Sequence, residues 1–207
     1  INFQPVIRKI EWRIFMNRKI AERYQRKKII LEGALKSYSK NGIEGMTMDD
    51  IALNSDFGKA TIYYYFPSKE DIICSLMETG WQDLWESVEE VVIENISSRK
   101  KFIKILNKMA DIVFDNRVLY EFLFTVPRNI TIPDDKASWK TFQNRTYATL
   151  QSIVDEGIGE GDFADIKPEL FMKAVGGIFH GIVFMGEQKK LEENDIETLI
   201  SNFIYPS

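Results

Sequence analysis

The sequence has very few of the residues that form metal centres and disulfides. Among its 207 residues there are one cysteine, Cys74, and one histidine, His180. A lone cysteine excludes an intramolecular disulfide, and a lone histidine excludes a two-histidine metal site or a Cys/His zinc cluster. We therefore expect no metal and no cofactor, and the scarcity of cysteine favours a reducing compartment.

Long apolar runs are also missing. No stretch approaches the roughly 18 uninterrupted apolar residues of a membrane-spanning helix, and the first residues lack the charged-then-apolar order of a signal peptide. Hydrophobic residues still make up 44% of the chain, which is enough for a packed core in one large or two small domains. The composition predicts a cytoplasmic protein without a membrane partner.

Charge is unevenly distributed along the chain. Residues 1–70 carry 13 lysines and arginines against 8 acidic residues, whereas residues 71–207 carry 14 against 23. Nine of the basic residues lie between Arg8 and Lys28, together with only two acidic ones. Such a segment suits a polyanion, either a nucleic-acid backbone or an anionic membrane surface, unless it is only a solvated helix face.

Apolar residues recur with helical spacing almost throughout, which predicts an all-α protein. Thr47 and Asp50 have the spacing of a capping box at the start of a short helix, which breaks about eight residues later at Asp56. A second short helix is expected over 59–66, and Ser68 caps the long helix that follows. Two short helices joined by a tight turn have the proportions of a helix-turn-helix, whose second helix can enter a major groove.

The second of these short helices carries three consecutive tyrosines, Tyr63, Tyr64 and Tyr65. Successive helical residues point about 100° apart, so the three side chains cannot all lie in a core. At least one phenol is expected in solvent, where it can donate to a phosphate oxygen. Lys69 falls at the start of the next helix, where free N–H groups already attract an anion.

Residue identities in this region follow a fixed order and spacing. They are Ile30-Leu31-Glu32-Gly33-Ala34-Leu35-Lys36-Ser37-Tyr38, Gly42, Thr47, Ile51-Ala52, Lys59-Ala60-Thr61-Ile62-Tyr63-Tyr64-Tyr65-Phe66 and Ser68-Lys69-Glu70. The region resembles the N-terminal domain of TetR-family transcriptional regulators. The resemblance implies an all-helical homodimer, with an N-terminal three-helix DNA-binding head and a C-terminal helical bundle for effector binding and dimerisation. It places the DNA-contacting positions on Thr47, Lys59, Ala60, Thr61, Tyr63, Tyr64, Tyr65 and Lys69.

The implied domains are residues 1–67 for DNA binding, with a basic N-terminal extension, and residues 68–207 for effector binding and dimerisation. The implied function is a ligand-responsive repressor that binds palindromic operator DNA as a homodimer and is released by a small-molecule effector. Two positions depart from the family pattern. Asp56 replaces the turn glycine, and Gly58 replaces the serine that caps the recognition helix, so no hydroxyl contact is carried over there.

Candidate effector residues are aromatic or polar side chains of the C-terminal region, because ligand pockets are mostly apolar with a few polar groups. Core packing is the more frequent reason for any one of them. The candidates are Trp81, Trp85, Phe114, Phe122, Phe142, Tyr147 and His180. For the dimer interface, Ala174, Gly177 and Gly181 place small residues at i, i+3 and i+7, where a second helix can approach closely.

Two other classes of function compete with this interpretation. An enzyme would need a nucleophile with its base or carboxylates on facing helices, and the sequence contains no Glu-x-x-His pair, so we do not expect an enzyme. A membrane-surface or protein-interaction module built on the basic N-terminal helix is the more serious alternative. That alternative predicts binding to anionic vesicles and leaves the three tyrosines unexplained.

Overall fold

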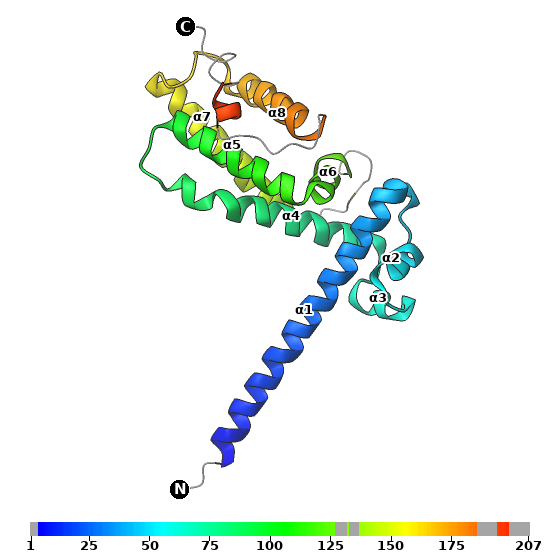
Figure 1. The fold of residues 1–207 in the computed structure, drawn as a ribbon. Helices are drawn as coiled ribbons and strands as arrows, with labels where there is room; N and C mark the ends of the chain where they lie inside the picture. The colour runs from blue at the N-terminus through cyan, green and yellow to red at the C-terminus, as the bar shows by residue number, and fades with distance from the viewer. Residues whose placement is uncertain (1–3, 127–131, 133–136, 186–193, 199–207) are drawn as a thin grey trace. The chain divides into compact units, whose positions relative to one another are not determined.

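The computed structural model describes residues 4–126, 132, 137–185 and 194–198, with side chains from residue 18 onward. Every regular element in these residues is a helix, which confirms the all-α prediction (Figure 1). The chain divides into two compact units between Ile73 and Cys74, which we call the head and the body. Within the described residues, no helix combines the length and the apolar character that crossing a bilayer requires.

The head contains three helices: α1 (Gln4–Gly45), α2 (Met48–Ser55) and α3 (Lys59–Tyr65). The 42-residue α1 includes the basic N-terminal extension, which therefore lengthens the first helix. Gly42 has φ 67° and ψ −177° and interrupts the helix three residues before its end. Only glycine adopts such a conformation without steric cost.

Local side-chain bonds set the ends of α2. The hydroxyl of Thr47 accepts from the backbone N–H of Asp50 at 3.2 Å and donates to its carboxylate at 2.5 Å. The predicted cap is thus confirmed, although the carboxylate reaches the hydroxyl of Thr47 and not its backbone N–H. The helix ends at Asp56, which has φ 56° and ψ 36° and is the one described non-glycine residue with positive φ. Aspartate tolerates this left-handed region, so the turn forms without the family's glycine.

The three helices of the head meet over a small apolar core of Ile30, Ala34, Ile51 and Ile62, all with 0% exposure. A Cβ atom added to Gly33 of α1 would lie only 2.9 Å from the backbone nitrogen of Ser55 in α2. Helices α1 and α2 therefore approach closely at Gly33, where a side chain would not fit. Because the core holds one face of α3, the opposite face is turned outward.

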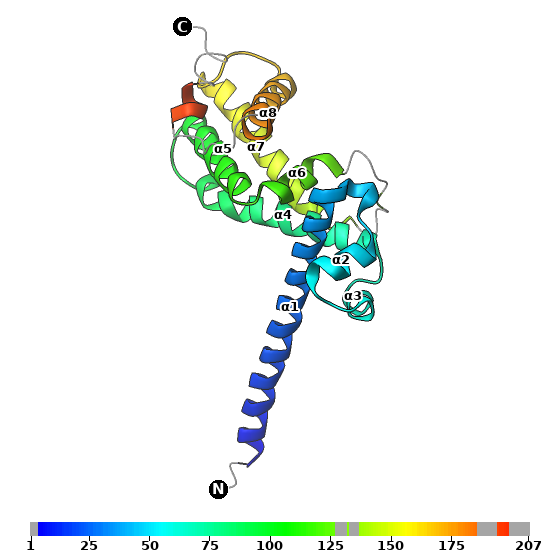
Figure 2. The same ribbon diagram turned by 45° about the vertical axis from the view of Figure 1, so that its right-hand side comes forward.

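The described part of the body contains five long helices, α4 (Lys69–Val92), α5 (Ser98–Asp115), α6 (Arg117–Thr125), α7 (Lys140–Glu160) and α8 (Pro168–Phe184), and a short helical segment over residues 194–198. The first of them, α4, begins in the head at the predicted cap, where Ser68 Oγ accepts from the backbone N–H of Asp71 at 3.2 Å. The helix α7 ends at Gly161, which is in the left-handed conformation, and Pro168 lies in the first turn of α8. In the body α5 packs against α7 and α8 (Figures 1 and 2).

Aromatic rings hold the body helices together. A buried cluster is formed by Phe102 of α5, Phe163 between α7 and α8, and Phe171 of α8, with ring centroids 4.9 to 5.7 Å apart. Gly157 of α7 lies against this cluster, where an added Cβ would overlap the ring of Phe163. Phe102 belongs to this cluster and also borders the space between α5, α7 and α8.

Candidate nucleic-acid interface and ligand cavity

The outward face of α3 carries phenols. Ile62 on its inner face is fully buried, whereas Tyr63 and Tyr64 are 44% and 68% exposed and Tyr65 is half-buried. The expectation that the three phenols cannot all lie in the core is thus confirmed. Exposed phenols on a short helix can donate to phosphate oxygens or to base edges.

Lys59 at the start of α3 is paired across the turn with Asp49 of α2, and the distance from Nζ to Oδ1 is 2.7 Å. The hydrogen bond to this carboxylate, followed by its negative charge, raises the pKa of Lys59 above its ordinary value. The ammonium therefore remains charged at neutral pH and is held at the surface beside α3. Asp49 also places a negative charge on the same surface.

A basic side chain of α1 lies over the tyrosines. The Arg23 guanidinium is 5.4 Å from the ring centroid of Tyr64 and 5.3 Å from that of Tyr65, and its Nη1 donates to the Tyr64 hydroxyl at 3.3 Å. The two tyrosine rings meet edge to face at 5.0 Å. Arg23 thus holds the phenols of α3 in place through a cation–π contact and a hydrogen bond.

Sequence reasoning did not single out Arg23, although a signal exists. Counting back in steps of three or four residues from buried Ile30, which faces the core, gives Lys27 and then Arg23 on the same face of α1. Lys27 has its ammonium 5.2 Å from the ring centroid of Phe66. The apolar face of α1 therefore continues as a basic face beside α3.

The other predicted DNA-contacting residues also lie in the head. Thr47 is exposed, but its hydroxyl is engaged in the cap of α2. Ala60 is exposed and Thr61 half-buried on α3. Lys69 is half-buried, and its ammonium donates to the carbonyl of Ile43 at 2.9 Å, so it also ties the end of α1 to the start of α4.

The body contains a cavity of about 570 Å³ between α5, α6, α7 and α8. Its polar lining comes from Tyr147, Lys173 and His180. Most of the remaining lining is aromatic or aliphatic and includes Phe102, Leu106, Met109, Phe124, Phe179 and Phe184. A predominantly apolar cavity with few polar groups is typical of a small-molecule site.

Three of the predicted effector residues lie at this cavity. Tyr147 and His180 line it, and the buried ring of Trp81 packs 5.6 Å from Tyr147 and 5.8 Å from Phe124, centroid to centroid. The indole N–H of Trp81 has no hydrogen-bond partner among the described residues. A buried N–H without a partner is costly, and a bound acceptor would satisfy it.

The other four predicted effector residues do not line the cavity. Phe122 is fully buried in the core, Phe142 is half-buried and Phe114 is 43% exposed on α5. Trp85 donates to Glu89 at 3.0 Å and lies under the guanidinium of Arg145. The prediction misses the lining residues Phe124, Phe179 and Phe184, because the sequence does not show which aromatics of neighbouring helices face a common space.

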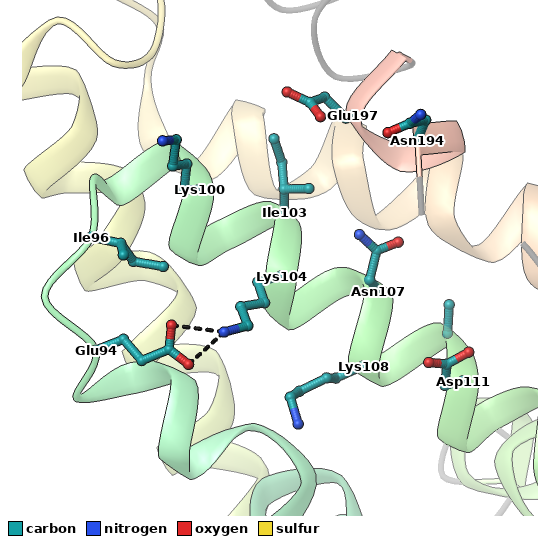
Figure 3. A pocket seen from close by; sticks show the side chains of 11 residues that line it. Glu94, Ile96, Lys100, Ile103, Lys104, Asn107, Lys108, Asp111, Asn194 and Glu197 are labelled. Carbon is teal, nitrogen blue, oxygen red and sulfur yellow. Dashed lines mark hydrogen bonds and ion pairs between the residues drawn. The ribbon is translucent and has the colours of Figure 1, made fainter. Parts of the chain in front are cut away.

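A second hollow of about 670 Å³ lies on the outer side of α5 (Figure 3). Lys100, Lys104 and Lys108 line it at successive turns, and Lys104 pairs with both carboxylate oxygens of Glu94 at 2.6 and 2.8 Å. Asp111 and Glu197 also border it. Three lysines facing three carboxylates give an anionic ligand no net attraction, so the apolar cavity is the better effector candidate.

The predicted dimer residues lie on an accessible face of α8. Ala174 and Gly177 are exposed, and Gly181 is half-buried. A Cβ atom added at Gly177 or Gly181 would meet no atom within 4 Å. Leu170, one turn before Ala174 on the same face, is 55% exposed. Among the residues that the structure describes, none covers this face, so another helix can approach it.

Comparison with known proteins points to one family. Residues 30–76 match the family model "Bacterial regulatory proteins, tetR family". Over 181 residues the chain is 22% identical to the uncharacterized HTH-type transcriptional regulator YhgD of Bacillus subtilis, which covers 86% of this chain and 94% of the relative. It is 24% identical to IcaR of Staphylococcus aureus, the negative transcriptional regulator of the biofilm operon icaADBC, over 84% of this chain and 78% of the relative. The crystal structure of AibR in complex with isovaleryl coenzyme A and operator DNA has a similar fold, with a TM-score of 0.74 at 17% identity over 88% of this chain and 100% of that one.

Proposed function

Since the chain belongs to the TetR family of transcriptional regulators, we propose that it is a ligand-responsive repressor that binds palindromic operator DNA as a homodimer. Each head places α3 in a major groove, and the two heads contact half-sites about 34 Å apart, one helical turn of the duplex. The name of IcaR describes that relative as a negative regulator, and the AibR complex contains both operator DNA and a small ligand. These descriptions support the proposal by analogy.

The outward face of α3 is the observation that carries the proposal. Ile62 and Phe66 hold this seven-residue helix to the head core, whereas Lys59, Tyr63 and Tyr64 are directed away from it. Burying these phenols and this ammonium in an apolar contact would be unfavourable, because they are polar or charged. Both kinds of group donate hydrogen bonds, which suits them to contact phosphate oxygens. Thr47, Ala60, Thr61, Tyr65 and Lys69 complete the proposed contact surface.

Homodimerisation is proposed through α8, with Ala174, Gly177 and Gly181 at the helix contact. A two-fold dimer is required for two half-sites to be read at once. The open face of α8 lets a partner helix approach closely, and the exposed Leu170 supplies apolar surface beside the small residues. Packing of α8 against its copy would bury both.

The effector is proposed to bind in the cavity between α5, α6, α7 and α8. The mostly apolar lining predicts a ligand with an apolar body. Lys173 and His180 supply hydrogen-bond donors at the wall, which predicts that the ligand also carries a hydrogen-bond acceptor or an anionic group. The indole N–H of Trp81 offers a further donor beside the cavity. Ligand binding would shift α4 and so weaken DNA binding through its different affinity for two arrangements of the dimer.

Selection of genomic DNA fragments by the purified protein tests this proposal. Binding should saturate at discrete palindromic sites that excess anionic vesicles do not compete for. Tyr64→Ala and Lys59→Ala should each lower affinity for the selected operator about tenfold, since each removes a group that donates a hydrogen bond to a phosphate oxygen, while the thermal unfolding midpoint changes little.

Matched controls come from the same unit of the molecule. Leu53 is 81% exposed on α2, and Lys36 is exposed on α1, so Leu53→Ala and Lys36→Ala should leave operator affinity unchanged. If Tyr64→Ala and Lys59→Ala also bind as the unmodified protein does, α3 is not the recognition helix.

A further inference from the structure

The N-terminal extension of α1 includes a well-described basic segment, residues 18–28. It contains six lysines and arginines and a single acidic residue, Glu22, which pairs with Arg26 at 2.9 Å. The segment therefore carries a net charge of plus five. Arg18, Arg23 and Lys28 are exposed.

One face of this segment continues the face of α1 that packs in the head. Ile30 and Ala34 are fully buried against the head core, and Lys27, Arg23 and Lys19 precede them at spacings of three or four residues. The face of α1 that is turned toward α2 and α3 therefore changes from apolar to basic at Lys27. In both ribbon views α1 continues well beyond α2 and α3 (Figures 1 and 2).

The basic segment meets the proposed DNA-contacting surface at the phenols. Arg23 donates to the hydroxyl of Tyr64 at 3.3 Å and lies over the rings of Tyr64 and Tyr65. Arg26 lies 6.0 Å from the ring centroid of Phe57, in the turn that precedes α3. The cations of α1 and the outward face of α3 therefore form one continuous surface.

We propose that residues 18–28 are a second DNA-binding element, which contacts the phosphate backbone beside the groove that α3 enters. This inference rests on the proposed function. At 1.5 Å per residue the segment is about 16 Å long, close to the length of five base pairs at 3.4 Å each. Duplex DNA is its partner because the surface is cationic and continuous with α3. Binding to a membrane surface would require a broad apolar helix face. The segment has only two large apolar side chains, Ile20 and Tyr24, which is too few for such a face.

The salt dependence of DNA binding tests the proposal without knowledge of the operator. The triple variant Arg18→Gln, Lys19→Gln, Arg23→Gln is compared with the full unmodified chain on a random-sequence 30-base-pair duplex. The slope of log K against log salt concentration should fall by about 0.9 for each phosphate that the variant no longer neutralises, so by up to about 2.7 per protomer. The matched control, Lys100→Gln, Lys101→Gln, Lys108→Gln in the body, should keep the slope of the unmodified chain.

Circular dichroism and thermal unfolding establish that the variants keep their helices. An α1 variant that is folded and has the same slope as the body control overturns the proposal. So does loss of binding to phosphatidylglycerol vesicles with no change in DNA binding, which would assign the segment to a membrane surface. Failure of the proposed function is recognised by a different experiment. In that case the unmodified chain selects no discrete genomic sites. The salt slope on the random duplex still decides whether residues 18–28 contact DNA.

Discussion

The Lys59–Asp49 ion pair puts a carboxylate on the surface that is proposed to meet phosphates. Asp49 attracts the ammonium and raises the pKa of Lys59. If this surface meets DNA as proposed, the same carboxylate would also repel the phosphates. Asp49→Asn removes the negative charge while keeping the size of the side chain. We expect DNA affinity to rise roughly threefold to fivefold, with a steeper dependence on salt, measured by fluorescence anisotropy on a labelled duplex.

A nearby carboxylate outside the proposed surface controls for overall charge. Glu44 is exposed near the end of α1, and Glu44→Gln changes the net charge of the head equally. The two variants should differ in DNA affinity if Asp49 acts at the interface. Equal affinities would show that only the total charge matters. Asp49 also lies in the first turn of α2, so Asp49→Asn should lower stability by roughly 0.3–1 kcal/mol.

Tyr120 of α6 makes the stability of the body dependent on alkaline pH. It is 1% exposed, and its hydroxyl has no hydrogen-bond partner among the described residues. Burial, followed by the negative charge of Asp83, raises the pKa of Tyr120 above its ordinary value of about 10. Because the pKa of Tyr120 is higher in the folded state than in the unfolded state, its contribution to the free energy of unfolding is fully present below about pH 10. That contribution is lost as the pH rises toward the folded-state pKa.

Replacing this hydroxyl tests the argument. Tyr120→Phe should leave the free energy of unfolding at pH 7 unchanged or raise it by about 1 kcal/mol, because an unpartnered buried hydroxyl is removed. Between pH 10 and pH 11 the variant should lose less stability than the unmodified protein in urea unfolding. Tyr24→Phe, at a 70% exposed position, should follow the unmodified protein at every pH. An equal alkaline loss in Tyr120→Phe would contradict the assignment.

The small residues of α8 allow the helix face to be tested separately from the cavity. Gly177 belongs to the face and also borders the cavity, whereas Gly181 does not line it. An added Cβ at Gly181 would meet none of the described atoms within 4 Å. Glycine is less favourable in a helix than alanine by roughly 0.8–1 kcal/mol, and leucine ranks just below alanine, so leucine is the better helix former here. Gly181→Leu should therefore keep or raise protomer stability while it weakens the dimer, as measured by sedimentation equilibrium.

Gly159 provides the matched substitution. It lies on α7, is exposed, and an added Cβ there also meets nothing within 4 Å. Gly159→Leu adds the same side chain to a helical glycine away from α8 and should leave the dimer unchanged. If Gly181→Leu sediments as Gly159→Leu does, the contact between protomers lies elsewhere.

The sequence predicts the helices well where their ends depend on neighbouring residues. The caps at Thr47 and Ser68 and the helix break at Asp56 each depend on residues within a few positions, so their spacing is sufficient. That at least one α3 phenol must be exposed follows from helical geometry alone. These features are local, and local chemistry can be read directly from the order of residues.

Contacts between distant residues are not predictable in the same way. Tyr64 and Arg23 are 41 positions apart, and their contact depends on how α3 packs against α1. The cavity depends on which sides of four body helices face one another. Phe122 fills the core, and Phe124, two positions later on α6, lines the cavity. Helix geometry predicts that these two side chains point in different directions, but not which direction faces the core and which the cavity. Composition and periodicity do not separate these two roles.

One continuous helix links the two units of the chain. α4 begins with its cap in the head and continues to Val92 in the body, where Trp81 lies beside two residues of the cavity wall. A ligand that repositions these rings therefore acts on the helix that carries the head. Coupling of this kind is thermodynamically reciprocal, since the factor by which ligand weakens DNA binding equals the factor by which DNA weakens ligand binding.

This reciprocity gives a prediction for the whole protein. Carboxylic acids of increasing chain length serve as probes, because the cavity is mostly apolar and has Lys173 and His180 at its wall, and an active probe should weaken operator binding roughly 5- to 150-fold. Gly176 lines the cavity, and an added Cβ there meets nothing within 4 Å, so Gly176→Phe can place a ring in the ligand's space. That variant should bind operator as the unmodified protein does and no longer respond to the probe, and Gly159→Leu should retain the response. If Gly176→Phe still responds to the probe, the effector acts at another site. Calorimetry gives both the factor by which ligand weakens DNA binding and the factor by which DNA weakens ligand binding. If these two factors differ, ligand and DNA do not act on the same conformational equilibrium of the protein.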